Sequence, residues 1–471
     1  MKVTQVAIRP TEASANAGRP TLTPELLAAS GARYSRNNEG LEAILAKIDP
    51  DNLDKSVDSI FRMIDYGHQS ISDMVPVAMF IDGISMWLAY YVWTLCPTAG
   101  GQESSTRYIK LSPDALIAPN KIGIPAELQG KWHDAMQRSF EAYEAALSVW
   151  EEMAARMPDV ARIPHSLLDD PSEKASKQVA RMRRNYGFDR ARNLLPTAIS
   201  TNMMLIMSAR GWVQLCQHLL SYPLPEPQAL GSAIRGELEL CAPRMLKHAT
   251  AKDSMLQGIE RELCAFQQAA AQEPPEHLKE GAVDVECAPT PSLEVMLPGD
   301  VTPEQLAEDL KFHDNRYAWT GQGLKRTAVR FKWDAVAFAE IRDLNRHRTG
   351  SKFCPFVPVG FYVALDQWPE VEKSSRSLFR GWGAFGRGAS AAARSRLAEG
   401  DWSYVYWTLL GTQYPFEHVT TADKFLYEAE LRTGTGAHFR YAQHLRDVLA
   451  LWYERFPQTR GLVLEGSAEP E

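Results

Sequence analysis

The residues best suited to chemistry lie in two short stretches, one in each half of the chain. The second-half stretch is 346–351, with the order Arg-His-Arg-Thr-Gly-Ser. Its two arginines can grip phosphate oxygens, because guanidinium forks form charge-assisted and often bidentate hydrogen bonds. Cations at the C-terminal end of a helix also complement the helix dipole without binding any ligand. The stretch is therefore a candidate phosphate site, with a helix terminus as the alternative.

The first-half stretch, 100–107, has the order Gly-Gly-Gln-Glu-Ser-Ser-Thr-Arg. A glycine pair lets a backbone approach a ligand closely. Ser105 and Arg107 can bind a phosphate, and Gln102 or Glu103 can contact the edge of a ring. Ser105 is not expected to be a nucleophile, because no His–Asp pair is evident near it. The alternative is a polar surface loop with a salt bridge.

Both stretches follow the same predicted elements: an alternating strand, an Asp and a short apolar helix. Apolar residues alternate at 75–81 and again at 329–333, which predicts two strands. Asp82 and Asp334 are then the expected helix N-caps. The spacing from each Asp to its motif differs by only one residue between the halves, which indicates an internal duplication.

Other segments predict the surroundings of these stretches. Aromatic and apolar residues at helical spacing over 132–150 predict a long amphipathic helix. The apolar run 194–220 predicts a buried helix. The Gly/Ala/Ser/Arg-rich segment 374–400 is expected to be a mobile insertion. The last helix carries its apolar face over 441–452.

The length of 471 residues predicts two domains. The expected boundaries are an N-terminal domain at 1–268, a linker at 269–281 that contains two consecutive prolines, and a C-terminal domain at 282–471 that starts with a strand near 283–285. The fold class expected is α+β, with two tandem domains, each a mixed or antiparallel sheet flanked by long helices.

Composition excludes several classes of protein. The net charge of −7 argues against a nucleic-acid-binding protein. No apolar run approaches the roughly 18 residues of a membrane span, and the N-terminus resembles a strand more than a signal peptide. Six scattered cysteines without a CxxC pair predict reduced thiols in the cytoplasm and no metal site.

At the two motifs the chain resembles the flavin-dependent thymidylate synthases (the ThyX family), whose signature is RHRxxSxNxxSxR. The matching segments are 31–35, 67–70, 81–85, 102–108, 192–196 and 208–210 in the first half, and 346–351, 431–432 and 437–441 in the second. In the first half, Leu95-Cys96-Pro97 stands where the family has Arg-His-Arg. In the second half, nothing after Ser351 preserves the end of the signature. Each half therefore keeps a complementary part of one motif.

The resemblance implies roles for particular residues. The residues implied for FAD binding are Arg346, His347, Arg348, Ser351, His68 and Ser35. Those implied for binding a nucleotide monophosphate are Gln102, Glu103, Ser105, Arg107, Arg192 and Arg432. Ser105 and Arg432 are the catalytic candidates by resemblance. His68 can equally be an ordinary capping histidine.

The implied activity is FAD-dependent methylation of a uracil nucleotide, of the dUMP-to-dTMP type, with methylenetetrahydrofolate and NADPH as co-substrates. The alternative is a flavin- or nucleotide-binding paralogue that lacks this activity or acts on a different pyrimidine nucleotide. The family forms its site between subunits of a homotetramer. A homodimer of two-copy chains is therefore expected to mimic that tetramer, with one copy holding the nucleotide and the other the cofactor.

Overall fold

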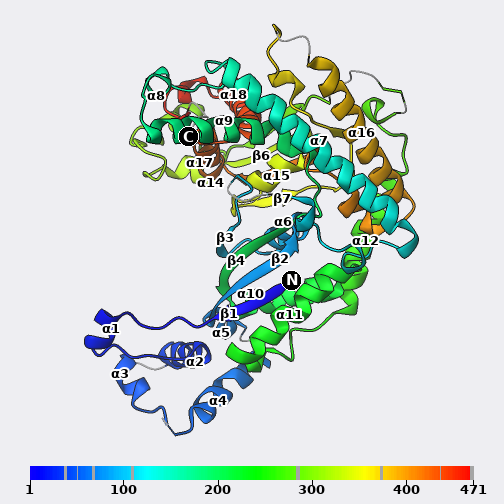
Figure 1. Cartoon of the computed structure of the whole chain (residues 1–471). Helices are drawn as coiled ribbons and strands as arrows, with labels where there is room; N and C mark the ends of the chain where they lie inside the picture. The colour runs from blue at the N-terminus through cyan, green and yellow to red at the C-terminus, as the bar shows by residue number, and fades with distance from the viewer. Residues whose placement is uncertain are drawn as a thin grey trace. The chain divides into compact units, whose positions relative to one another are not determined.

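A computed structural model describes the residues 1–36, 40–49, 51–65, 69–107, 111–279, 281–282, 287–371, 375–434 and 436–466. The described chain is α+β, with two antiparallel sheets, and it divides into two compact units (Figure 1). Unit 1 contains residues 1–110, 115–126 and 198–263, and unit 2 contains 111–114, 127–197 and 264–471.

The sheet of unit 1 has the strand order β1-β2-β4-β3. Its strands are β1 (Lys2–Val6), β2 (Pro76–Ser85), β3 (Gly100–Glu103) and β4 (Ser200–Ser208). The alternating pattern at 75–81 correctly predicted β2. The prediction of a helix across 194–220 is wrong, because that segment contains the central strand β4, whose residues alternate between buried and more exposed. Only its C-terminal part is helical.

The helices that begin within unit 1 include two that follow strands directly. They are α1 (Glu12–Asn16), α2 (Pro24–Tyr34), α3 (Gly40–Leu45), α4 (Leu53–Asp65), α5 (Ser70–Asp73), α6 (Met86–Leu95), α10 (Ala209–Ser221), α11 (Pro225–Cys241) and α12 (Asp253–Ala270). Helix α6 follows β2 and leads to β3, and α10 follows β4. Unit 1 therefore positions the Gly-Gly-Gln-Glu stretch at the edge of its sheet.

The sheet of unit 2 repeats this arrangement, with the order β5-β6-β9-β7 and β8 added on β9. Its strands are β5 (Pro291–Met296), β6 (Ala328–Ala337), β7 (Ser351–Phe353), β8 (Gly360–Phe361) and β9 (Thr412–Thr421). In both sheets the second strand leads through a short helix to the edge strand. The matching order supports the predicted internal duplication. The strand expected near 283–285 lies outside the described residues.

A β-bulge occurs at the same place in both sheets, and it explains why neither predicted N-cap is correct. The register shifts between Asp82 and Ile84 in β2 and between Trp333 and Val336 in β6. Each strand continues past its Asp, so α6 is capped instead by Ser85, whose hydroxyl accepts the Leu88 N–H. Asp334 accepts the N–H of Thr290 at 2.6 Å instead of capping a helix.

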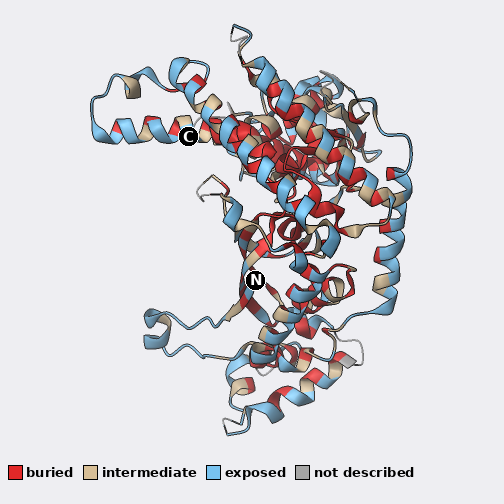
Figure 2. Ribbon diagram, turned by 45° about the vertical axis from the view of Figure 1, so that its right-hand side comes forward, coloured by how far each residue is buried: buried red, intermediate tan, exposed pale blue. Residues whose placement is uncertain are grey.

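The helices of unit 2 come from both halves of the sequence. They are α7 (Gln129–Arg156), α8 (His165–Leu168), α9 (Glu173–Ala191), α13 (Pro303–Glu308), α14 (Gln322–Arg326), α15 (Phe338–Leu344), α16 (Arg376–Ala398), α17 (Ala422–Thr433) and α18 (Phe439–Arg455). Figure 2 shows their buried residues on the faces turned inward. The predicted amphipathic helix 132–150 is α7, and the predicted last helix is α18.

Helix α7 packs in unit 2 although it precedes the predicted linker. Trp132 donates its indole N–H to the Tyr406 carbonyl at 2.9 Å. The Trp150 ring lies 4.9 Å from that of Trp368 and 5.3 Å from that of Phe379. The compact units therefore divide the chain differently from the predicted boundaries at 268 and 282, because segment 127–197 belongs with the C-terminal sheet.

The segment expected to be a mobile insertion forms the 23-residue helix α16. One of its glycines, Gly386, permits close packing. A Cβ on Gly386 would lie 2.1 Å from the Phe361 ring, so only glycine lets the helix approach that ring. The small residues that suggested mobility instead allow two elements to touch.

Candidate functional site: an arginine cluster around Asp343

The candidate site lies in unit 2, where α15 and the turn after it present acidic and basic side chains together. An Arg192 Nη2 lies 3.4 Å from Oδ2 of Asp343, and Nε of Arg346 lies 3.7 Å from Oδ1 of the same carboxylate. Arg192 follows α9 directly and also contacts the Ala339 carbonyl at 3.5 Å. Residues more than 150 positions apart in sequence thus meet at one carboxylate.

Asp343 is surrounded by positive charge. Burial raises the pKa of its carboxyl, but the guanidinium groups of Arg346, Arg192, Arg432 and Arg342 outweigh burial and hold that pKa well below its ordinary value. Four guanidinium groups act on this one carboxylate. The surplus of charge-assisted donors suits an anion such as a phosphate.

His347 provides a neutral hydrogen-bond acceptor beside these guanidinium groups. Arg432 donates its Nε–H to Nε2 of His347 at 2.7 Å, so the His347 proton is on Nδ1. Burial, aided by the nearby charges of Arg432 and Lys352 and opposed by Glu428, lowers the pKa of His347 to about 3. The ring therefore stays neutral at ordinary pH and orients the Arg432 guanidinium.

A buried polar layer supports the turn that carries His347. His418 places Nδ1 3.0 Å from Glu428 and Nε2 2.7 Å from the Thr349 carbonyl. Lys352 donates to the His347 carbonyl. Burial raises the pKa of Glu428, but His347, His418 and Lys352 lower it to about 2 overall. The layer therefore holds the Arg-His-Arg turn in place through its backbone.

Glu340 is a second acidic group in α15, one turn before Asp343. It is fully buried, and neither carboxylate oxygen has a well-formed hydrogen bond to a described residue. Burial raises its pKa to about 8, against the opposing effects of Arg192 and Arg440. Glu340 is therefore a neutral acid at pH 7.

The structure brings together some of the residues predicted from sequence. Arg192, Arg346, His347 and Arg432 form the cluster. Arg348 follows in the same turn and is half-buried, and Ser351 begins β7, where it is exposed opposite Val419. The acidic members of the site, Asp343 and Glu340, could not be predicted from sequence, because an Asp and a Glu in a short apolar helix resemble ordinary helix surface.

The other predicted residues lie in unit 1, or are not described. Gln102 and Glu103 lie on β3 opposite Met204 and Met203. The Ser105 hydroxyl accepts the Arg107 N–H at 3.4 Å. Ser35 ends α2, where its hydroxyl donates to the Ala32 carbonyl at 2.9 Å. His68 lies outside the described residues.

The donor set of the cluster fits the phosphate groups of FAD or of a nucleotide, because in the described part of the chain four guanidinium groups act on the Asp343 carboxylate. Arg346 keeps a third of its side chain exposed. Among the described residues, no group of three or more His, Cys, Asp and Glu side chains is arranged to hold a metal ion. None of the described helices is long and apolar enough to cross a membrane.

Fold and site together define an α+β protein with two similar antiparallel sheets and a cluster of arginines around a buried carboxylate. Residues 20–244 match the family described as thymidylate synthase complementing protein. The predicted resemblance to the flavin-dependent thymidylate synthases is thereby confirmed for this part of the chain. The C-terminal sheet lies beyond the matched residues, and its likeness to the first rests on strand order.

Two curated relatives cover similar portions of the chain. UPF0159 protein Ta1429 of Thermoplasma acidophilum is 25% identical over 235 residues, which are 46% of this chain and 47% of that protein. The flavin-dependent thymidylate synthase of Clostridium tetani is 22% identical over 230 residues, which are 49% of this chain and 83% of that enzyme. The chain thus spans about half the length of the first relative and most of the second.

A solved structure, that of the UMP/dUMP methylase PolB from Streptomyces cacaoi bound with 5-Br dUMP, also has similarity to the chain. The match has a TM-score of 0.32 and 14% identity, and it covers 52% of this chain and 93% of that one.

Proposed function

We propose that the protein is a flavin-dependent methylase of thymidylate synthase type that acts on a uracil nucleotide. The single observation that carries the proposal is the cluster of Arg192, Arg346, His347 and Arg432. It joins two residues implied for the nucleotide with two implied for the cofactor. The match of residues 20–244 to the thymidylate synthase complementing protein family supports the same reaction class.

In this proposal the cluster binds anionic ligands and the chemistry belongs to the flavin. Arg346 and Arg348 hold phosphate groups of FAD, and Arg192 and Arg432 contact the nucleotide. Neutral His347 accepts from Arg432 and so fixes the direction of that guanidinium. Bound FAD, reduced by NADPH, would supply the hydride that converts the methylene group transferred from methylenetetrahydrofolate to C5 of the pyrimidine into a methyl group, while the C5 hydrogen leaves as a proton.

The remaining implied residues keep their roles as part of the proposal. Ser351, His68 and Ser35 are assigned to the cofactor, Gln102, Glu103, Ser105 and Arg107 to the nucleotide, and Ser105 with Arg432 to catalysis. The two copies, 1–268 and 282–471, divide these tasks in a cytoplasmic homodimer. The complementary loss of motif in the two halves supports that division of labour.

Tritium release tests the proposal directly. Purified chain reconstituted with FAD is expected to retain a visible flavin absorbance and to release tritium from 5-tritiated dUMP or UMP when NADPH and methylenetetrahydrofolate are supplied. Arg346→Gln is expected to lose flavin, because a charge-assisted contact is removed. Arg376→Gln, an exposed arginine at the start of α16, is the control and should retain it.

Two outcomes decide between the candidates. A chain that cannot be loaded with FAD contradicts the proposal. Flavin and nucleotide binding without tritium release from either substrate favours the alternative, a binding paralogue. The binding paralogue is tested as an alternative because the first copy has lost part of the signature. It has Leu95-Cys96-Pro97 where the family has Arg-His-Arg.

A further inference from the structure

A loop at residues 309–321 in unit 2 contacts helix α17, the helix that carries Arg432, and presents aromatic side chains to solvent. Phe312, Tyr317 and Trp319 of this loop are 69%, 77% and 54% exposed. A group of large aromatic side chains on a surface marks a place where a ligand or a partner binds. The loop is therefore a candidate binding surface beside the arginine cluster.

The loop is held at its base and in its middle. At the base, the Asp309 carbonyl accepts the Gly321 N–H at 3.0 Å, and the Asp309 carboxylate accepts the Leu324 N–H at 3.0 Å. In the middle, Nε2 of the buried His313 lies 2.9 Å from the Glu430 carboxylate of α17. Because these contacts order the backbone in advance, a ligand that binds the aromatic side chains pays little for ordering the loop.

Tyr317 connects this surface to the arginine cluster through one further ring. The Tyr317 ring centroid lies 6.0 Å from that of Tyr427 on α17, and the Tyr427 ring lies 6.3 Å from that of His347. His347 is the residue that accepts the Arg432 Nε–H. A continuous row of rings therefore leads from the cluster to the exposed face of Tyr317. Aromatic faces of this kind stack on planar rings.

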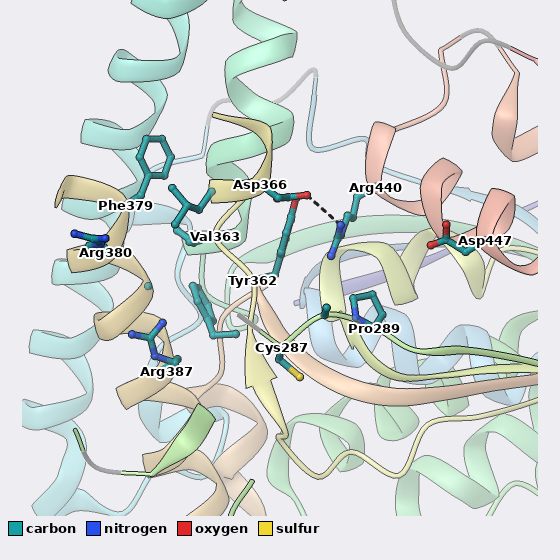
Figure 3. A pocket seen from close by; sticks show the side chains of 14 residues that line it. Cys287, Pro289, Tyr362, Val363, Asp366, Phe379, Arg380, Arg387, Arg440 and Asp447 are labelled. Atoms are coloured by element: carbon teal, nitrogen blue, oxygen red, sulfur yellow. Dashed lines mark hydrogen bonds and ion pairs between the residues drawn. The ribbon is translucent and has the colours of Figure 1, made fainter. Parts of the chain in front are cut away.

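The preceding residue, Arg316, brings a guanidinium to the C-terminal end of α17. A Cβ on Gly434 would lie 3.2 Å from an Arg316 Nη2, and Gly434 is two residues beyond Arg432. Within the described part of the chain, no carboxylate pairs with Arg316. Arg440 shows the contrast in Figure 3, because its guanidinium is already paired with Asp366 at 3.2 Å. Arg316 can therefore donate to a phosphate.

The other cations near the loop do not form a surface for a membrane or a nucleic acid. Lys311 pairs with Glu308 at 3.4 Å, and Arg326 pairs with Asp300 at 2.7 Å. An extended anionic partner needs several available cations side by side. One unpaired guanidinium next to one exposed ring instead fits a small ligand that has one phosphate and one planar ring.

We propose that the loop 309–321 forms one wall of the nucleotide site, with Tyr317 stacked on the base of a pyrimidine nucleoside monophosphate and Arg316 in contact with its phosphate. This inference rests on the proposed function, because it takes the nucleotide to be at Arg432. It adds two binding residues from a loop that lies outside the family motifs.

Isothermal titration calorimetry of the full chain with UMP and ribose 5-phosphate separates the two contacts. Tyr317→Ala should weaken UMP binding about tenfold, as expected for one lost base–aromatic stack, and should leave ribose 5-phosphate binding unchanged. Tyr317→Phe keeps the ring and should bind UMP as the native chain does. Arg316→Gln should weaken both ligands by the same factor, because both carry the phosphate.

The matched control is Phe312→Ala, which removes a similarly exposed ring from the same loop. In the described chain the Phe312 ring contacts Trp319, at 6.5 Å between centroids. This variant should bind UMP with native affinity. Equal UMP affinities for the Tyr317→Ala and Phe312→Ala variants would overturn the inference, as would a native chain that does not bind UMP.

Tritium release from 5-tritiated UMP distinguishes this inference from the proposed function. If Tyr317→Ala releases tritium with the KM of the native chain, the methylase proposal stands and the stacking role is wrong. If Tyr317→Ala weakens UMP binding as expected but the native chain releases no tritium, the nucleotide wall stands and the methylase proposal is wrong.

Discussion

At the scale of single residues, Glu340 makes the clearest prediction. Its pKa is raised from an ordinary 4.5 to about 8 by burial. Between these values the unfolded chain loses a proton that the folded chain keeps, so the free energy of unfolding falls as pH rises, by about 1.4 kcal/mol per pH unit. Glu340→Gln removes this loss and should be more stable than the native chain by roughly 3–5 kcal/mol at about pH 8.5.

Urea unfolding of both proteins at about pH 5 and pH 8.5 measures this difference, which should shrink to near zero at the lower pH. Glu399→Gln is the matched control, because Glu399 is exposed at the end of α16. It should show no such dependence on pH. A constant difference between the native chain and the Glu340 variant would contradict a neutral buried acid.

His347 changes the free energy of unfolding with pH in the opposite direction to Glu340. Burial lowers its pKa from 6.5 to about 3, so its contribution to stability is present above pH 6.5 and is lost as pH falls toward 3, while the unfolded chain takes up a proton. His347→Gln keeps an acceptor for Arg432 but cannot titrate. Between pH 7 and about pH 5 the native chain should lose about 2 kcal/mol more stability than this variant.

Chemical unfolding at the two pH values gives the comparison, and exposed His133→Gln serves as the control. The idea fails if the native chain and the His347 variant lose stability in parallel. The same variant also reports on function. If His347 only orients Arg432, nucleotide binding should survive in the variant, since the glutamine oxygen can accept from the same Nε–H.

At the scale of elements, two glycines of α16, Gly386 and Gly388, allow the packing of this helix to be tested. Gly386 lies against the Phe361 ring, whereas a Cβ on Gly388 meets nothing within 4 Å. Gly386→Ala should destabilise the protein by about 1–3 kcal/mol, because the helix must move away from a rigid ring. Gly388→Ala should stabilise it by about 0.5–1 kcal/mol, because alanine favours a helix over glycine.

Thermal or urea unfolding of the two variants gives opposite signs if α16 packs as described. Two changes of the same sign would show that the Phe361 contact is not maintained. The pair is well matched, since both substitutions add one methyl group to the same helix two residues apart. The position of the glycine along the helix is then the only difference.

Helices and strands with a regular spacing of apolar residues were predicted correctly from sequence, but the positions of their ends were not. Alternation identified β2 and β6, and helical spacing identified α7 and α18. The two Asp caps failed because a bulge carries each strand beyond the polar residue. Helix α16 was expected to be mobile because small residues suggest flexibility, whereas Gly386 allows the helix to pack against Phe361.

The candidate site was partly predictable for a similar reason. Arg192, Arg346, His347 and Arg432 have motif neighbours that singled them out. Asp343 and Glu340 do not, because their importance comes from burial among charges supplied by distant segments. The residues next to Asp343 in sequence do not indicate that the Arg192 guanidinium lies 3.4 Å from its carboxylate. Such acidic partners become visible only when the fold brings these segments together.

At the scale of the whole molecule, unit 2 depends on segment 127–197. A chain of residues 282–471 loses Trp132 and Trp150, each completely buried, and leaves the Tyr406 carbonyl without its indole donor. Burial of one such Trp contributes about 3–5 kcal/mol, comparable to much of the stability of a domain. This fragment should therefore show no cooperative unfolding transition by circular dichroism.

Co-expression with residues 127–197 is the informative comparison, because it restores α7 and α9 as a separate chain. Recovery of a cooperative transition would support the described unit. A cooperative transition in residues 282–471 alone would contradict it and would favour the boundaries predicted from sequence. Far-ultraviolet spectra of the two samples distinguish an unfolded fragment from one that has simply lost stability.

The interleaving of the two units also constrains the order of events on the ribosome. Helices α7 and α9 leave the ribosome long before their C-terminal partners have been made: Tyr406 and Phe379 for α7, and Phe439 for α9. At ~5–20 residues per second, that wait is of the order of ten to fifty seconds. During it α7 can pack on α9, but Trp132 and Trp150 still lack Tyr406, Trp368 and Phe379. A chaperone that shields exposed apolar side chains should therefore bind nascent chains that end between residues 200 and 400.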